Sequence, residues 1–140
     1  MGSASLWNMP SFDPRTIRDA LRERDVALKP PITADALDRL TRWAGAELHH
    51  DVLSVLREFD GFSDWDFDTA SFVSIWPVDK ALADDWTKRP MLAFSDWSLN
   101  AFVFGFDPVI AGPVISIEDG RQVAPSYRDF WPLLLGDRLF

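Results

Sequence analysis

The stretch 91–107 constrains the fold more than any other part of the chain. Two apolar runs, 91–94 and 99–106, flank a short polar break. In the second run, large and small side chains alternate at strand period. The large residues are Phe102, Phe104 and Phe106, and the small ones are Ala101, Val103 and Gly105. We therefore predict two antiparallel strands joined at residues 96–98. Neither face of the second strand is polar, which predicts a central strand covered on both sides, with helices on its Phe face.

The length and composition predict a single domain. With 140 residues, of which 47% are hydrophobic, the chain can bury a core without disulfides or a structural metal. We expect one domain over 1–140, with its main core at 33–135 and an additional N-terminal helix at 13–26.

Composition also excludes several functional classes. The chain has no cysteine, so it has no disulfide framework, thiol nucleophile or cysteine metal site. No apolar run reaches the roughly 20 residues that span a bilayer, and no signal-peptide pattern is visible. We therefore expect a cytoplasmic protein without membrane contact. The net charge of −8 disfavours nucleic-acid binding and suits a basic protein partner, or simply solubility.

Three helices are expected before the first strand. The first begins with Asp13 as N-cap and Pro14 at the first helical position. The second begins at Thr33 and ends at Gly45. The third covers 48–59, where apolar residues recur on one face, and it ends at the turn signal of residues 60–61.

The remainder of the chain predicts further strands and a closing helix. Residues 62–68 read as a loop, 72–76 as a strand and 78–86 as a short helix. Strands are expected at 114–117 and 122–124, joined by an Asp-Gly turn. Ser126 and Asp129 form an imperfect capping box for the last helix, which ends at Gly136. This order predicts an α+β fold: an antiparallel sheet of four to six strands, with N-terminal helices and a C-terminal helix packed beside it.

No established catalytic or metal-binding motif is present. Asp64, Asp66 and Asp68 have the spacing of a calcium loop, but its required Gly and Glu are absent at the sixth and twelfth positions. His49 and His50 are adjacent, so on a helix they point about 100° apart and cannot chelate one ion together. We expect two surface or half-buried histidines, no metal, no cofactor and no enzymatic activity.

An acidic and aromatic segment is the strongest functional signal. Every charged residue from Glu58 to Asp79 is acidic, and aromatic rings are interspersed among the acids. Rings supply desolvated contact area, and carboxylates steer a cationic partner. The alternative is that the rings complete the core and the acids are merely solvated. Trp97, expected in the central hairpin turn, is a second exposed aromatic. The candidate partner-binding residues are Glu58, Asp60, Asp64, Trp65, Asp66, Asp68 and Trp97.

Four segments together resemble the SUKH superfamily, which includes fungal cell-wall-assembly regulators and many bacterial toxin-immunity proteins. They are the helix 48–59 closed by Asp60-Gly61, the strand and helix start 74–78, the stretch 92–97 with the following strand that ends at 105–107, and the stretch 113–127 with Phe130 after it. The resemblance covers about 33–135. It departs from the family at Asp60, where asparagine is more usual, and at residues 46–48, where Leu-Pro often stands. It implies a sheet with adjacent helices, no catalytic residues, and neutralisation of a toxin by binding.

The leading hypothesis is therefore a non-catalytic protein-binding module, an immunity protein that occupies a basic toxin surface, acting as a monomer or weak dimer. Two alternatives stay open. One is a small-molecule or carbohydrate-binding domain, or an enzyme, with a cleft formed by Trp65, Trp76 and Trp97. The other is an intracellular scaffold with a partner that is not a toxin.

Overall fold

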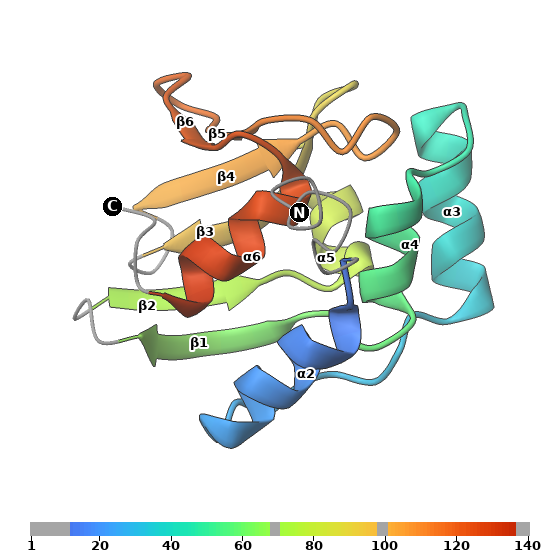
Figure 1. Cartoon of the computed structure of the whole chain (residues 1–140). Helices are drawn as coiled ribbons and strands as arrows, with labels where there is room; N and C mark the ends of the chain where they lie inside the picture. The colour runs from blue at the N-terminus through green and yellow to red at the C-terminus, as the bar shows by residue number, and fades with distance from the viewer. Residues whose placement is uncertain (1–11, 68–70, 98–100, 137–140) are drawn as a thin grey trace, which may run out of the picture.

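The computed structural model describes residues 12–67, 71–97 and 101–136, and it gives the backbone alone at 64–67, 71 and 72. Within these ranges the chain forms five helices and a six-stranded antiparallel sheet (Figure 1). The helices are α2 (Pro14–Glu23), α3 (Ala34–Ala44), α4 (His50–Leu56), α5 (Val78–Ala83) and α6 (Tyr127–Leu135). The strands are β1 (Phe62–Phe67), β2 (Ser71–Ile75), β3 (Leu92–Trp97), β4 (Phe102–Phe106), β5 (Val114–Ser116) and β6 (Gln122–Ala124). The α+β fold predicted from the sequence is confirmed.

The sheet is a meander in which each strand pairs with its neighbour in the sequence. The order is β1-β2-β3-β4-β5-β6, and all five pairings are antiparallel. The two edge strands are therefore β1 and β6. Figure 1 shows α2 beside β1, α6 in front of the sheet, and α3 and α4 together near one end of the strands.

Both faces of β4 are buried, as its sequence predicts. Phe104 and Phe106 belong to a cluster that includes residues of α2, α4 and α6. Val103 belongs to a second cluster with residues of α3 and α5. On the first side, the Phe106 ring stacks on Tyr127 of α6 with centroids 4.5 Å apart, and Phe94 meets Phe130 edge-on at 5.1 Å.

Three of the predicted helix starts are confirmed by their capping hydrogen bonds. Asp13 accepts from the Arg15 N–H at 3.0 Å, Thr33 accepts from the Ala36 N–H at 3.1 Å, and Ser126 accepts from the Asp129 N–H at 3.0 Å. The helix expected from residue 48 instead begins at His50. The reason is a cap that the sequence pattern did not suggest: Nδ1 of His49 accepts from the Asp51 N–H at 3.0 Å.

Two expectations about the strands are wrong. Residues 62–67 form β1 and not a loop, because an alternation of acids and rings has the period of a strand and β1 pairs with β2. Residues 96 and 97 belong to β3 and not to a turn, because Trp97 pairs with Val73 on one side and Phe102 on the other. Residues 68–70 and 98–100 lie outside the described ranges.

Candidate functional site

The acidic segment, defined as residues 58–79, follows the edge of the sheet. It leaves the end of α4, forms β1 and β2, and enters α5. Because β1 is the first strand of the sheet order, it is paired through β2 alone. The structure thus places most of the predicted partner-binding residues along one edge strand and its approach.

Glu58 contributes to the packing of the helices. Its carboxylate lies 2.5 Å from the guanidinium of Arg18 on α2, and both side chains are about three-quarters buried, with 24% and 26% exposed. This ion pair joins α2 to the end of α4. Whether Glu58 also contacts a partner stays a prediction.

Asp60 fixes the turn that leads into β1. Its Oδ1 accepts from the backbone N–H of Val78, the first residue of α5, at 2.9 Å. Burial raises the pKa of the Asp60 carboxyl above its ordinary value, and the Val78 N–H offsets part of that rise. The next residue, Gly61, has φ of +88° and lies so close to β2 that a Cβ would sit 2.3 Å from the Ile75 carbonyl oxygen. Asp60 therefore connects β1 to α5.

Asp64, Trp65 and Asp66 lie on β1, where the structure gives their backbone. Trp65 pairs with Val73 and Asp66 with Phe72. Their side chains, and the whole of Asp68, lie outside the described residues, so the partner contacts of these four residues stay predictions.

Trp97 is half-buried at the end of β3, and its ring lies 5.1 Å from that of Phe102. Val73 pairs with Trp65 on one side and with Trp97 on the other, so the backbones of the two tryptophans flank one residue of β2. The structure therefore brings Trp97 into the same sheet row as Trp65.

Trp76, the third tryptophan of the predicted cleft, has a role in the core. Only 4% of it is exposed, and its indole N–H donates to Oδ2 of Asp96 at 2.5 Å. The Nζ of Lys80 lies 4.2 Å from the centre of its ring. Asp96 is itself buried on β3, which the polar residues around it in the sequence did not indicate.

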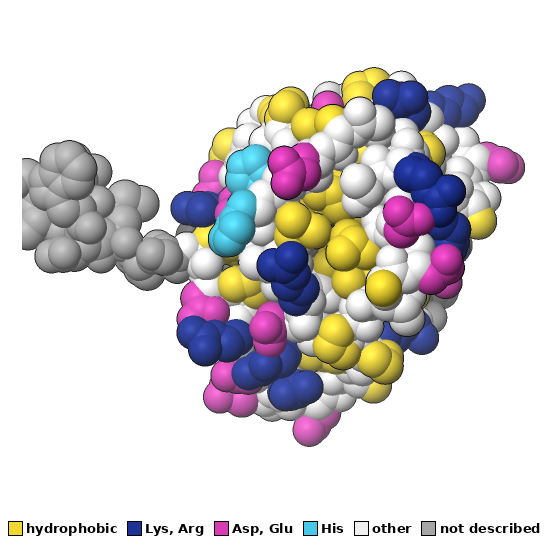
Figure 2. Space-filling view, turned by 90° about the vertical axis from the view of Figure 1, so that its right-hand side faces the viewer, with side chains coloured by type: hydrophobic (Ala, Val, Ile, Leu, Met, Phe, Trp, Pro, Cys, Tyr) yellow, Lys and Arg dark blue, Asp and Glu magenta, His cyan; other side chains and the backbone are white. Residues whose placement is uncertain are grey.

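A second buried carboxylate lies at the start of α4. Asp51 is bound by Arg128 of α6, with Nη2–Oδ1 at 3.1 Å and Nε–Oδ2 at 3.2 Å. His49 and His50 lie beside it, with their Nδ1 atoms 3.8 and 3.9 Å from its oxygens. Figure 2 shows the two histidines side by side at one margin of the face formed by α3 and α4, where apolar side chains gather between charged ones. As expected from the sequence, one histidine is half-buried and the other exposed.

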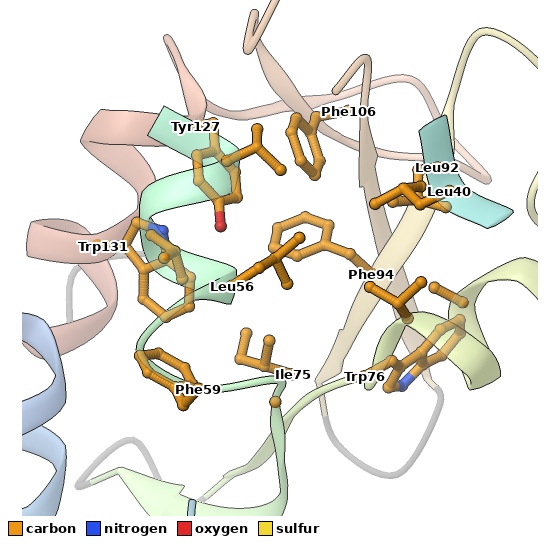
Figure 3. Close-up of a pocket in the computed structure, with 15 residues that line it drawn as sticks. Leu40, Leu56, Phe59, Ile75, Trp76, Leu92, Phe94, Phe106, Tyr127 and Trp131 are labelled. Carbon is orange, nitrogen blue, oxygen red and sulfur yellow. The ribbon is translucent and has the colours of Figure 1, made fainter. Parts of the chain in front are cut away.

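The core contains a small apolar cavity of about 30 Å³ between the two clusters (Figure 3). Its walls come from both clusters and include Leu56, Phe94 and Trp76, and no charged residue lines it. The hydroxyl of Tyr127 and the indole of Trp131 both lie at this cavity. Burial raises the pKa of the Tyr127 hydroxyl far above its ordinary value. This volume is enough for water but not for a substrate.

Within 12–67, 71–97 and 101–136, no group of three or more His, Asp or Glu could hold a metal ion. None of the helices in the described ranges has the length and apolar character required to cross a membrane. The sequence matches no protein-family model and no curated protein.

Proposed function

We propose that this protein is a non-catalytic protein-binding module with a basic partner, and that the acidic segment 58–79 forms its binding surface. The observation that carries the proposal is the position of β1 at the edge of the sheet. A strand at an edge has backbone groups available to another chain, and carboxylates along it favour a cationic partner and fix its register.

The ion pairs of the protein support this choice of surface. On α3, Asp35 and Asp38 are each paired with an arginine one turn later. The acidic segment has no arginine or lysine of its own, and its ion pairs at Glu58 and Asp79 use arginines of α2 and α3. Negative charge between these two ends has no cation within the segment to offset it.

The more specific proposal follows the resemblance to SUKH domains: an immunity protein that neutralises a cognate bacterial toxin, for example a nuclease. Nucleases bind a polyanion through basic surfaces, and an acidic sheet edge would compete for the same surface. The net charge of −8 supports this reading. An intracellular scaffold would use the same edge with a different basic partner.

The proposal is tested with a basic toxin domain as the partner, first sought among the proteins encoded by genes adjacent to this one. We expect the double substitution Asp66→Lys and Asp68→Lys to slow association and abolish its salt dependence, because rim charges act mainly on the association rate. Substitutions at exposed sites usually change stability by no more than about 0.5 kcal/mol, and we expect the variant to fold on that basis. Association rates at low and high salt are the measurement.

The matched control is Glu47→Lys with Glu118→Lys, which makes the same change of charge at two exposed acids outside the acidic segment. We expect it to reduce association less than the Asp66/Asp68 double variant does. If the two double variants slowed association equally, net charge alone would explain the effect. An unchanged association rate in the Asp66/Asp68 double variant would show that the acidic segment is not the binding surface.

A further inference from the structure

A surface cavity of about 220 Å³ lies where three segments that are distant in the sequence meet. They are the C-terminal end of α3, the residues before β3 and the turn after β4. The residues that line the cavity are Trp43, Ala44, Ala46, Arg89, Pro90, Asp107, Pro108 and Val109. The volume exceeds that of the roughly 150 Å³ cavity that holds a benzene molecule in another protein. The cavity shares no residue with the acidic segment.

Backbone and side-chain hydrogen bonds hold the β4 side of this cavity in place. The Pro108 carbonyl accepts from the His49 N–H at 2.9 Å, which ties the turn to the start of α4. Within the turn, the Asp107 carbonyl accepts from the Ala111 N–H, and Oδ1 of Asp107 accepts from the Val109 N–H, both at 2.9 Å. The Asp107 carboxylate is thus oriented before any ligand arrives.

Two opposite charges line the cavity without neutralising each other. Within the described ranges, neither Arg89 nor Asp107 forms an ion pair. The guanidinium of Arg89 donates to the Ala44 carbonyl at 3.4 Å, a long bond that uses one of its five N–H donors. An arginine fork binds a carboxylate, and a carboxylate binds an ammonium group.

We propose that this cavity binds a small zwitterion with an apolar side chain, of the class of free α-amino acids. Arg89 binds the carboxylate and Asp107 the ammonium group, while the side chain packs on Trp43, Pro90 and Val109. The indole ring adds a favourable surface for the ammonium group. This binding site is independent of the proposed partner surface, so either can fail without the other.

The test uses L-leucine as the probe, added to the full-length ¹⁵N-labelled protein. We expect shifts of the Trp43 indole resonance and of the Ala46 and Val109 amides, with a Kd on the order of 1 mM because both charged groups are partly solvated. N-acetyl-L-leucine lacks the ammonium charge and L-leucinamide lacks the carboxylate. Each should bind at least about tenfold more weakly than leucine, the loss expected for one charge-assisted hydrogen bond.

Two substitutions and a control locate the binding. Arg89→Gln and Asp107→Asn should each weaken leucine binding at least about tenfold, and the asparagine keeps an oxygen for the Val109 N–H. Arg42→Gln is the control, since Arg42 lies on the same helix as Trp43 but pairs with Asp38. It should leave the affinity unchanged. Absence of shifts, shifts at other residues, or an analogue that binds as tightly as leucine would overturn the proposal.

Discussion

Asp51 and Arg128 form a two-pronged ion pair that joins the start of α4 to α6 across 77 positions of the sequence. The carboxylate is 8% exposed and the guanidinium side chain is 52% exposed. The pair therefore combines a buried anion with a cation that water also reaches, and its contribution to stability should lie between those of surface and buried pairs.

Arg128→Gln tests this contribution. We expect the free energy of unfolding to fall by about 1 to 2 kcal/mol, because the substitution leaves a buried carboxylate without its cation. Urea denaturation provides the measurement. Arg15→Gln is the matched control, since Arg15 pairs with the more exposed Asp13 and its loss should cost clearly less. Equal losses in the two variants would contradict this account.

The His49 cap gives a second prediction. His49→Ala removes the acceptor for the Asp51 N–H and should reduce the free energy of unfolding by about 1 kcal/mol. His49→Asn restores a capping oxygen and should recover most of the loss. His50→Ala, at a side chain that is 83% exposed, serves as control and should have little effect. If asparagine gave no recovery, the cap would not explain where α4 begins.

The raised pKa of Asp60 predicts a pH-dependent difference in stability between the wild type and an Asp60→Asn variant. Because burial raises its folded-state pKa above the unfolded value, the folded protein binds the proton more tightly, and Asp60 lowers stability as pH rises through that pKa. Asp60→Asn keeps an oxygen for the Val78 N–H without the charge. We expect this variant to be more stable than the wild type at pH 7, and the difference to shrink as pH falls below the folded-state pKa. A wild type that is the more stable of the two at pH 7 would show that the charge itself stabilises the turn.

Gly61 and Gly120 allow a matched comparison of two glycine-to-alanine substitutions. Both have positive φ, +88° and +73°, but a Cβ at Gly61 would meet the Ile75 carbonyl at 2.3 Å while one at Gly120 would meet nothing within 4 Å. Gly61→Ala should cost at least about 2 kcal/mol, and Gly120→Ala only about 1 kcal/mol for the left-handed conformation. Thermal unfolding of both variants compares them directly, and a similar loss in the two would mean that the approach to β2 has no energetic effect.

The helix caps and the two buried faces of β4 could be predicted from the sequence, because each depends on residues that are close together in the chain. The caps at Asp13, Thr33 and Ser126 depend on groups within three residues, and the alternation of β4 reports its own two faces. The strand β1 was missed because alternating acids and rings fit a loop and an edge strand equally well. The strand pairing that decides between them comes from other parts of the chain.

The candidate sites likewise divide into one that is contiguous in the sequence and others that are assembled from distant segments. The acidic segment is contiguous, so it is visible in the sequence. The Asp51–Arg128 pair and the cavity beside Trp43 are assembled from segments far apart in the chain. No spacing rule in the sequence relates Arg89 to Asp107, since only the path of the sheet and the end of α3 bring them to one cavity.

The meander also has a consequence for how the molecule assembles. Each strand pairs with its predecessor, so the sheet can form strand by strand during synthesis, with modest chain closures at each step. The contact between the two ends is different: Arg24, just after α2, donates to the Leu135 carbonyl at the end of α6, 111 positions later. Arg18 of α2 can pair with Glu58 as soon as α4 is made, but this second attachment near α2 requires α6. A nascent chain halted short of α6 would lack the rings of Tyr127 and Phe130 that pack on Phe106 and Phe94.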